Sequence, residues 1–423
     1  MLIPAYVREH FDQVVAALEK RNIAARPQLQ RLLELDETRR ATQAELDQTL
    51  ASANSIAKEI GQLFKQGATA EANQKKEASA TLKATAKTLQ ESLQQTANAL
   101  QDLLYQLPNI PHESVPKGNS DEDNEVVSEH GAIPTLQKDA LPHWELAKKY
   151  NLIDFELGAK ITGAGFPVYT GKGAKLQRAL INYFLDFNTA AGYGEVQVPH
   201  MVNEASGLGT GQLPDKEGQM YHVTEDDLYL IPTAEVPVTN IYRDSLLQAS
   251  ELPIQLTAYT PCFRREAGSY GAHVRGLNRL HQFDKVELVR IEESEHSYAA
   301  LDDMVAHVGK LLESLELPYR ILRLCGGDLG FTSALTFDFE VFSTAQNRWL
   351  EVSSVSNFES FQANRLKLRY KATDGKKQLA HTLNGSSLAL PRIVAGILEN
   401  HQTPEGIRIP KALVPYTGFE LIN

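Results

Sequence analysis

The sequence predicts an α+β protein with an N-terminal antiparallel pair of long α-helices. Three observations support this fold class. Residues 27–107 repeat apolar side chains at alternating steps of three and four residues, the period of a helical coiled coil. Residues 108–129 are rich in proline and then in acidic residues without periodicity, which is typical of a linker. From residue 130 to the end of the 423-residue chain, helical and strand patterns mix, as in an α+β domain.

The N-terminal part is predicted to form a helical arm. A short amphipathic helix over residues 11–18 precedes two long helices over about 27–66 and 74–107, separated by a polar turn that includes Gly67. Because this turn is short, the long helices should fold back on each other into an arm roughly 50 to 60 Å long, at about 1.5 Å per residue. The predicted seam residues are Leu46, Leu50, Ala53, Ala57, Ile60 and Phe64 in the first helix, and Leu82, Ala86, Leu89, Leu93, Thr96, Leu100, Leu103 and Leu107 in the second.

The outer part of this arm, residues 58–87, is basic, because six lysines outnumber three glutamates for a net charge of +3. On composition alone, a solvated coiled coil and a surface for an RNA backbone are equally open. The whole chain carries a net charge of −11, which argues against indiscriminate nucleic-acid binding but leaves a local basic patch possible. The lysines are Lys58, Lys65, Lys75, Lys76, Lys83 and Lys87.

Cysteine content and hydropathy bear on the compartment. Cys262 and Cys325 are too few for a disulfide framework, and no uninterrupted apolar stretch approaches membrane-spanning length. We therefore expect a cytoplasmic protein without a membrane partner.

Two strand-like segments, residues 262–266 and 281–288, should pair as a long antiparallel hairpin around a loop that contains Gly268, Gly271 and Gly276. Because strand side chains alternate between faces, each strand presents its functional groups on one side. These groups are Arg264 and Glu266 on the first strand, and Phe283, Lys285 and Glu287 on the second. An arginine suits a phosphate, an aromatic ring suits a purine, and a carboxylate suits an ammonium group. The hairpin thus predicts a nucleotide and an amine as ligands, with a plain solvated strand face as the alternative.

The sequence lacks the motifs of several other kinds of site. Residues 171–173 lack the hydroxyl residue that follows lysine in a P-loop, and residues 207–214 lack the third glycine of a dinucleotide fingerprint. His273 and His281 belong to no metal-ligand cluster, and residues 267–271 have alanine in the first place of a nucleophile elbow. With these sites excluded, we expect a reaction that the protein catalyses by positioning the reactants and by stabilising charge.

Three segments resemble the signatures of class II aminoacyl-tRNA synthetases. Their amino-acid sequences are similar to those of seryl-tRNA synthetases of the bacterial type. Residues 194–199 resemble motif 1, residues 262–288 resemble motif 2, and residues 384–392 resemble motif 3. The family's first arm helix and its connection to the catalytic domain are matched by residues 35–40, 54–61 and 109–116. The resemblance covers essentially the whole chain.

The resemblance implies an antiparallel class II sheet flanked by helices. Residues 1–107 would form the tRNA-binding domain with the arm, residues 108–129 the linker, and residues 130–423 the catalytic domain. The chain would be a homodimer with Pro199 of motif 1 at its interface. The arm lysines would contact the long variable arm of serine tRNA, and selenocysteine tRNA would also receive serine.

The implied first reaction is attack of the carboxylate of L-serine on the α-phosphorus of ATP, for which arginine and Mg²⁺ stabilise charge without a general base. Arg264 and Arg392 are the implied catalytic residues, at the α- and γ-phosphates. Glu351 and Ser354 are the implied ligands of Mg²⁺, which prefers oxygen. The implied ATP-binding residues are Arg264, Arg265, Glu266, Arg275, Phe283, Glu351, Val352, Ser353, Ser354 and Arg392.

The implied serine-binding residues include a segment, residues 232–237, that matches the family's substrate strand. Glu287 would face the ammonium group, and Asn384 and Ser386 would face the hydroxyl. Such a site rejects an analogue that lacks the hydroxyl, because its own polar groups would be left unpaired. Residues 207–214 resemble a loop on the substrate side, with an ordinary flexible loop as the alternative. The serine-binding residues are Thr233, Ala234, Glu235, Arg264, Glu287, Asn384 and Ser386.

The sequence allows two alternative functions. One is a ligase that activates a small amino acid for a carrier protein, but relatives of that type lack the arm. The other is a non-catalytic paralogue that binds only RNA or a partner, and loss of Arg264, Glu287 or Arg392 would have favoured it. The motif 2 loop departs from the family in residues that bear on contacts with the acceptor end of tRNA, namely Tyr270, Ala272 and His273.

Overall fold

The computed structural model describes residues 1–266 and 275–423, and the chain divides into two compact units. The helical unit contains residues 2–19 and 23–108, and the sheet unit contains residue 1, residues 20–22 and residues 109–423. Some positions of the predicted hairpin loop lie outside the described residues: Gly268, Tyr270, Gly271, Ala272 and His273.

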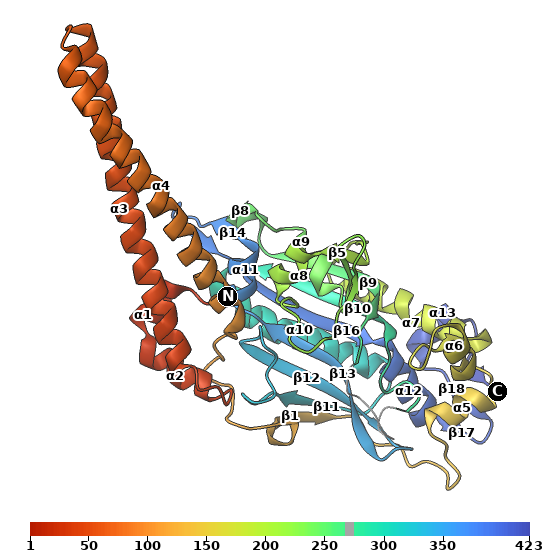
Figure 1. Ribbon diagram of the computed structural model, residues 1–423. Coiled ribbons are helices and arrows are strands. Elements are labelled where there is room, and N and C mark those ends of the chain that lie inside the picture. Colours follow the sequence, from red (N-terminus) through yellow and green to blue (C-terminus); the bar gives the residue numbers. More distant parts are fainter. Residues whose placement is uncertain (267–274) are drawn as a thin grey trace. The chain divides into compact units, whose positions relative to one another are not determined.

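The helical unit confirms the predicted arm. α3 and α4 run side by side as an antiparallel pair (Figure 1). Gly67 takes a φ of 77° in the turn that joins them, a conformation in which glycine meets no steric penalty. α4 begins at Thr69 instead of residue 74, and its buried stripe extends beyond the predicted seam to Ser79 and Ala72. The helices are α1 (Pro4–Glu9), α2 (Phe11–Glu19), α3 (Arg26–Lys65) and α4 (Thr69–Gln106).

The seam of the arm differs from the prediction in α3. Leu46 and Ala53 are buried there and Ile60 is half-buried, as predicted. Every second predicted position is instead exposed, and the residue just before it is half-buried. Alternating steps of three and four fit either choice, and in two of the three pairs both neighbours are apolar, so the spacing does not separate them. In the third pair the polar residue, Thr49, is the half-buried one. The exposed residues are Leu50, Ala57 and Phe64, and their half-buried neighbours are Thr49, Ile56 and Leu63.

The sheet unit is built on an eight-stranded sheet with the order β1-β11-β12-β13-β16-β10-β9-β4. Adjacent strands are antiparallel, except that β4 is parallel to β9. The antiparallel class II sheet expected from the resemblance is therefore confirmed. Its strands are β1 (Glu125–His130), β4 (Gly194–Glu195), β9 (Ile254–Phe263), β10 (Gln282–Glu292), β11 (Tyr319–Arg323), β12 (Leu335–Ser343), β13 (Arg348–Asn357) and β16 (His381–Ala389).

The edge strand β1 begins within the stretch that the sequence predicts as a linker. It pairs with β11, with Glu125 opposite Arg323 and His130 opposite Tyr319. Its side chains are exposed or half-buried, so the strand is held mainly by main-chain hydrogen bonds. A strand without an apolar face leaves no period of two in the sequence, which is why the pattern did not reveal it.

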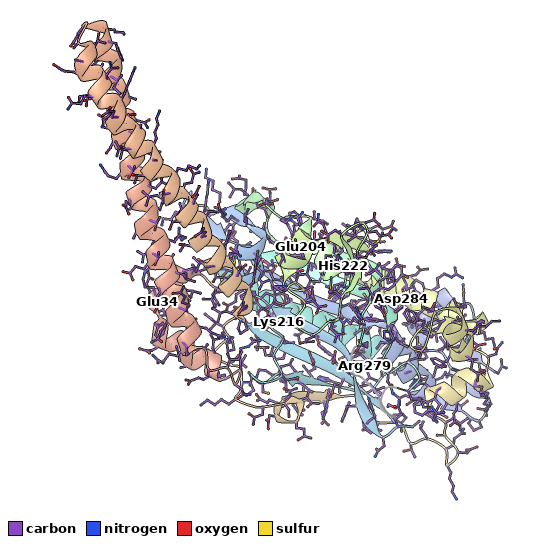
Figure 2. The ribbon with its side chains drawn as sticks, in the orientation of Figure 1. Glu34, Glu204, Lys216, His222, Arg279 and Asp284 are labelled. Atoms are coloured by element: carbon purple, nitrogen blue, oxygen red, sulfur yellow. The ribbon has the colours of Figure 1, made fainter. Side chains whose placement is uncertain are left out.

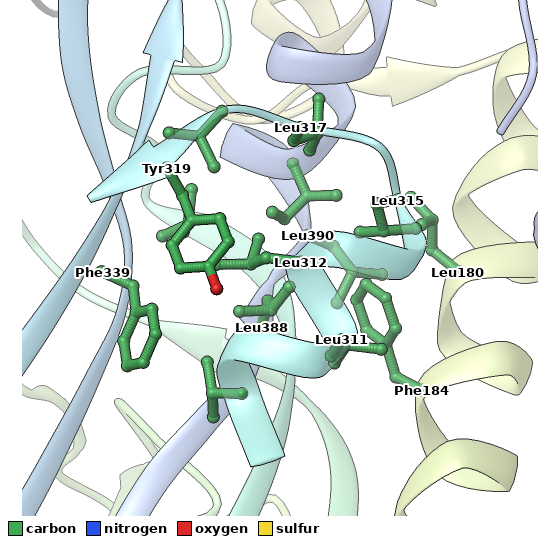
Figure 3. Close-up of a cluster of buried hydrophobic side chains, with 14 of the residues drawn as sticks. Leu180, Phe184, Leu311, Leu312, Leu315, Leu317, Tyr319, Phe339, Leu388 and Leu390 are labelled. Carbon is green, nitrogen blue, oxygen red and sulfur yellow. The ribbon is translucent and has the colours of Figure 1, made fainter. Parts of the chain in front are cut away.

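Helices cover the sheet and build the core. α10 (Ser297–Ser314) and α12 (Leu390–Asn400) pack on the sheet, and α7 (Gly171–Ala190) packs on β9 and α12. Figure 3 shows part of this core, where Tyr319 from the sheet lies beside Leu312 of α10, and Leu311 lies beside Phe184 of α7. Because α12 follows β16 directly, motif 3 spans a junction between a central strand and a buried helix.

The remaining helices and short strands surround this framework. The helices are α5 (His143–Lys149), α6 (Phe155–Ile161), α8 (Glu204–Thr210), α9 (Glu235–Asn240), α11 (Ser360–Leu366) and α13 (Val414–Thr417). The strands are β2 (Ile153–Asp154), β3 (Val168–Tyr169), β5 (Met201–Asn203), β6 (Tyr221–Val223), β7 (Leu228–Leu230), β8 (Leu246–Gln248), β14 (Arg369–Lys371), β15 (Lys377–Leu379), β17 (Gln402–Thr403), β18 (Gly406–Arg408) and β19 (Leu421–Ile422). In the described part of the chain, no helix has the length and apolar character needed to cross a membrane.

Candidate active site

A cavity of about 650 Å³ lies over the main sheet. Alternation along β10 separates it from the core, because Phe283, Lys285 and Glu287 line the cavity while Val286 and Leu288 point into the core. The shared face predicted for β10 is therefore confirmed. The residues predicted from the sequence that line this cavity are Thr233, Glu235, Arg264, Glu266, Phe283, Glu287, Glu351, Val352, Ser353, Ser354, Asn384, Ser386 and Arg392.

Three of the residues predicted to bind ATP or serine do not line the cavity. Ala234 is fully buried in a small apolar cluster. The guanidinium of Arg265 lies 6.0 Å from the ring centre of Tyr221, and that of Arg275 lies 4.9 Å from the ring centre of Trp144.

The first strand of the predicted hairpin ends earlier than expected. β9 ends at Phe263, so Arg264 and Glu266 do not share a strand face as predicted. Glu266 has a φ of 48°, which is incompatible with an extended strand, and its N–H donates to Oε1 of Gln219 at 3.1 Å. Both side chains still reach the cavity because the chain turns away from β10 after Arg264.

The predicted substrate strand, residues 232–237, is also corrected. Thr233 and Ala234 lie in a turn, and α9 begins at Glu235. The N–H of Glu235 donates to Oγ1 of Thr233 at 3.2 Å, and a hydroxyl that accepts from the backbone in this way favours a helix start over a strand.

One end of the cavity, here called the acidic end, consists of Thr233, Glu235, Glu287 and Asn384. Thr233 Oγ1 donates to Oε2 of Glu287 at 2.8 Å and accepts from Nζ of Lys285 at 2.9 Å. Asn384 Nδ2 donates to Oε2 of Glu235 at 2.9 Å and to Oε1 of Glu287 at 3.3 Å. Two carboxyl groups therefore converge on one amide.

Glu287 and Glu235 differ in how their negative charges are compensated by neighbouring groups. Nζ of Lys285 lies 2.6 Å from Oε2 of Glu287, and both side chains are almost completely buried. Burial, and then the charge of Glu287, raises the pKa of Glu235 to about 7. A cationic ligand at this end would supply the charge that Glu235 lacks, and it would favour the ionised carboxylate.

The middle of the cavity combines an aromatic ring with cations. The guanidinium carbon of Arg264 lies 5.2 Å from the ring centre of Phe283, and Nε of Arg264 donates to the carbonyl of Pro232 at 3.3 Å. Arg279, labelled in Figure 2, forms an ion pair with Glu266. A flat ring stacked on Phe283 would thus lie beside positive charge, as a nucleotide requires.

The other end of the cavity, here called the arginine end, consists of Glu351, Ser354 and Arg392. Pairing of β13 with β12 shifts so that Val352 is an extra residue in β13. Residues three apart point to opposite faces of a regular strand, but this bulge brings Glu351 and Ser354 to the same side, where both line the cavity. Arg392 Nη1 donates to the carbonyl of Glu351 at 2.6 Å and lies 3.7 Å from its Oε2.

Oxygen groups at this end fit Mg²⁺. Burial, and then the charge of Glu351, raises the pKa of Asp338 well above its usual range, and Oδ1 of Asp338 is buried without a protein partner. Asp338, Glu351 and Ser354 offer only oxygen, which Mg²⁺ prefers. Within residues 1–266 and 275–423, no cluster of three or more His, Cys, Asp or Glu could hold a metal by itself. Phosphate and water would therefore have to complete the shell of the ion.

Several cavity residues were not assigned a role from the sequence. Lys285 shares the face of Glu287, so its strand position was a usable signal. Asp338 was also detectable, as an acid between Phe337 and Phe339 in a mostly apolar strand. Gln219 gave no signal, because it belongs to an irregular segment between α8 and β6.

The glycine-rich run 207–214 is not the flexible loop that was kept as an alternative. Its first part belongs to α8, which begins after Asn203, whose Oδ1 accepts from the N–H of Ser206 at 3.0 Å. Gln212, just after this helix, lines the cavity. The run therefore reaches the cavity from a helix end.

Comparisons with known proteins cover both units. The model of the seryl-tRNA synthetase N-terminal domain matches residues 1–111, and the model of the class II tRNA synthetase core domain (G, H, P, S and T) matches residues 220–401. The serine–tRNA ligase of Salinibacter ruber is 52% identical over 99% of this chain and 98% of its own length. That of Chlorobium luteolum is 47% identical, with 100% of this chain and 99% of the relative covered.

Solved structures match the same fold. The seryl-tRNA synthetase of Pyrococcus horikoshii, complexed with ATP, has a TM-score of 0.93 and 32% identity, and the match covers 100% of this chain and 99% of that one. The cytoplasmic serine–tRNA ligase of Naegleria fowleri, in complex with AMP, has a TM-score of 0.85 and 27% identity over 99% and 96% of the two chains. Both matches include the helical unit as well as the sheet unit.

Proposed function

The chain belongs to the seryl-tRNA synthetase family, and from this premise we propose that the cavity over the main sheet activates L-serine with ATP before the seryl group passes to tRNA. The protein is a class II aminoacyl-tRNA synthetase that acts as a serine–tRNA ligase. The observation that carries the proposal is that one cavity presents an acidic end suited to an amine and an arginine end suited to a triphosphate.

Adenylate formation needs charge stabilisation in the middle of the cavity. A carboxylate oxygen of serine bonds to the α-phosphorus of ATP, and the bond from that phosphorus to the bridging oxygen of the β-phosphate breaks to release pyrophosphate. Arg264 would neutralise the α-phosphate, and Arg392 would bind the γ-phosphate. No side chain has to remove a proton, because the attacking carboxylate is already ionised. A ribose hydroxyl of tRNA then attacks the seryl carbonyl and displaces AMP.

The two substrates would divide the cavity between them. Phe283 would stack on the adenine ring. Glu235 and Glu287 would take the ammonium group of serine, and Asn384 and Ser386 would bind its hydroxyl. Alanine would leave these polar groups unpaired, which favours serine.

We also propose Mg²⁺ at the arginine end, held by Glu351 and Ser354. The ion would neutralise phosphate charge and help pyrophosphate to leave. Asp338 lies opposite Ser354 on β12 and adds a third oxygen group to the same wall.

The helical unit supplies the proposed contact with the long variable arm of serine tRNA, and of selenocysteine tRNA as a second substrate. Five of the six arm lysines are exposed, and Lys75 is paired with Glu59. Exposed lysines suit a phosphate backbone. The exposed lysines are Lys58, Lys65, Lys76, Lys83 and Lys87.

Two further proposals concern assembly and location. We propose a homodimer that uses β4 and Pro199, because this strand lies at the edge of the main sheet with exposed residues. We propose a cytoplasmic location, which two free and buried cysteines support.

A serine-dependent exchange of pyrophosphate into ATP tests the proposed function. The purified protein should catalyse this exchange with serine and far less with alanine, and it should then attach labelled serine to tRNA. No exchange with serine would overturn the proposal. Exchange without charging of tRNA would instead favour a ligase for another carrier.

Phe283→Ala should raise the KM for ATP, because stacking on a base contributes about 1 to 3 kcal/mol. Glu287→Gln should raise the KM for serine, because the ammonium group loses a counter-charge. Both constants are measured by pyrophosphate exchange, with Phe187→Ala on α7 as a control for loss of an aromatic side chain away from the cavity. A rise for the same single substrate in both cavity variants would show that the proposed division of the cavity is wrong.

Serine binding should weaken below neutral pH. Glu235 has a pKa raised to about 7, so in the free enzyme it becomes protonated as the pH falls through that value. Since the ammonium group requires the ionised form, the KM for serine should rise about tenfold per pH unit below 7 and level off above it. The KM for ATP over the same range is the control and should change little. A KM for serine that stays constant from pH 6 to 8 would contradict this role.

A further inference from the structure

A buried hydrogen-bond network behind the cavity joins α5 to the end of α12. His143 and Glu399 are both completely buried. Oε1 of Glu399 accepts from the N–H and Nδ1 of His143, at 2.9 and 2.7 Å, and from Nε2 of Gln346 at 2.9 Å. Its Oε2 accepts from the hydroxyl of Ser343. The carboxylate is therefore saturated with donors, and it fixes the orientation of the imidazole ring.

This arrangement also fixes the tautomer of His143. Because the carboxylate oxygen accepts from Nδ1, the ring proton is on Nδ1 and Nε2 is left as an acceptor. Nε2 accepts from the backbone N–H of Leu277 at 2.8 Å. Leu277 belongs to the segment that leads into β10, and it lines the cavity.

The next residue of that segment contacts Arg392. The carbonyl of Asn278 accepts from Nε of Arg392 at 3.2 Å, and Nδ2 of Asn278 donates to Oε1 of Gln346 at 3.1 Å. Arg392 and Glu399 are seven residues apart on α12, about two turns, so they share one helix face. One face of α12 thus holds residues 277–278 twice, directly through Arg392 and indirectly through His143.

We propose that His143 is a positioning residue for ATP, which acts by holding residues 277–278 so that the guanidinium of Arg392 is fixed in the cavity. The proposal rests on the proposed function, because it takes Arg392 as the group that binds the terminal phosphate. Close approach of the backbone supports it. Gly276 has a φ of 69°, and a Cβ there would lie 2.3 Å from Nε2 of His143.

Two substitutions of His143 separate positioning from packing. In His143→Asn, the amide can still donate to Glu399 but offers no acceptor to Leu277. In His143→Gln, the longer side chain can place its carbonyl oxygen near the position of Nε2. Loss of one buried hydrogen bond changes an equilibrium by roughly tenfold, so His143→Asn should raise the KM for ATP by about that factor, with the KM for serine unchanged. His143→Gln should restore most of the affinity for ATP.

Gly276→Ala tests the same contact from the other side. Its methyl group would push residues 277–278 away from His143 without removing a core side chain, so it should also raise the KM for ATP. The KM for ATP of this variant tests the proposal if His143→Asn does not fold. His401→Asn is the control, because His401 is buried at the end of α12, contacts the carbonyl of Leu315 and does not line the cavity. It should lower the melting temperature and leave the KM for ATP unchanged.

Pyrophosphate exchange and thermal unfolding are measured on all four variants and the unmodified enzyme. Equal KM values for ATP in His143→Asn and His143→Gln, or a rise in the KM for serine in proportion to that for ATP, would overturn the positioning role. An unmodified enzyme without serine-dependent exchange would overturn the proposed function instead.

Discussion

Arg264→Ala and Arg392→Ala should each slow seryl-adenylate formation by about 10² to 10³, which is the effect of removing one preorganised donor from a developing charge. Both guanidinium groups are already held by the backbone, Arg264 by Pro232 and Arg392 by Glu351 and Asn278. They would therefore meet the phosphates with little reorganisation. Serine-dependent pyrophosphate exchange measures the loss, and thermal unfolding shows whether each variant is folded.

Arg265→Ala is the matched control for this prediction. Arg265 is adjacent to Arg264, but its guanidinium lies over Tyr221 and does not line the cavity. Its removal should change exchange only slightly, as most substitutions away from a site do. Near-normal exchange in Arg264→Ala or Arg392→Ala would refute the assignment of that residue, and a severe loss in Arg265→Ala would mean that this arginine also reaches ATP.

The parts of the fold that the sequence predicted are those with a strong local period. The heptad spacing located both long helices of the arm, and the alternation after residue 281 located β10. The predictions were wrong where the local hydrophobic pattern fits two assignments equally or fits none. Leu63 and Phe64 are apolar neighbours that both fit the seam, and β1 is an edge strand without an apolar face. Pairing with a distant strand decides such cases, and one segment alone does not contain that information.

The candidate site also combines features that the local sequence predicts with features that depend on distant segments. The motifs named thirteen of the residues that line the cavity, but they did not show how Glu351 and Ser354 could face one ligand. That depends on the bulge at Val352, which exists only through pairing with β12. His143 lay outside every motif, because its contacts are with the distant residues Leu277 and Glu399.

The structure also indicates how much of the arm can be removed. α1 and α2 pack against the base of α3, where Val7, Leu18 and Leu29 are completely buried. Deletion of residues 27–107 would remove Leu29 and expose Val7 and Leu18. The cut is better placed farther out, with Leu46 joined to Leu89 through a short Gly-Ser turn, since these seam residues lie at nearly equal chain distances from the turn at Gly67. This deletion removes residues 47–88 and with them all six lysines of the outer arm.

The shortened enzyme should still form seryl-adenylate but should lose nearly all transfer to tRNA. Adenylate formation is retained because every residue assigned to ATP or serine lies after Leu230 in the sheet unit. Transfer fails because the proposed backbone contacts are gone. In the full-length enzyme, replacing the exposed lysines by glutamine should raise the KM for tRNA, and it should flatten the salt dependence by about one unit of slope per lost phosphate contact. Glutamine in place of Lys75 is the internal control, because this lysine is already paired with Glu59.

Exchange and charging measured side by side separate the possible roles of the arm. Loss of both activities in the shortened enzyme would mean that the arm supports the fold of the sheet unit, since exchange does not involve tRNA. Full charging would mean that the arm does not bind tRNA. Loss of charging alone, reproduced in the full-length enzyme by the lysine substitutions with a reduced salt slope, requires a direct electrostatic contact. Removal of a merely structural extension would not change the number of ions released on binding.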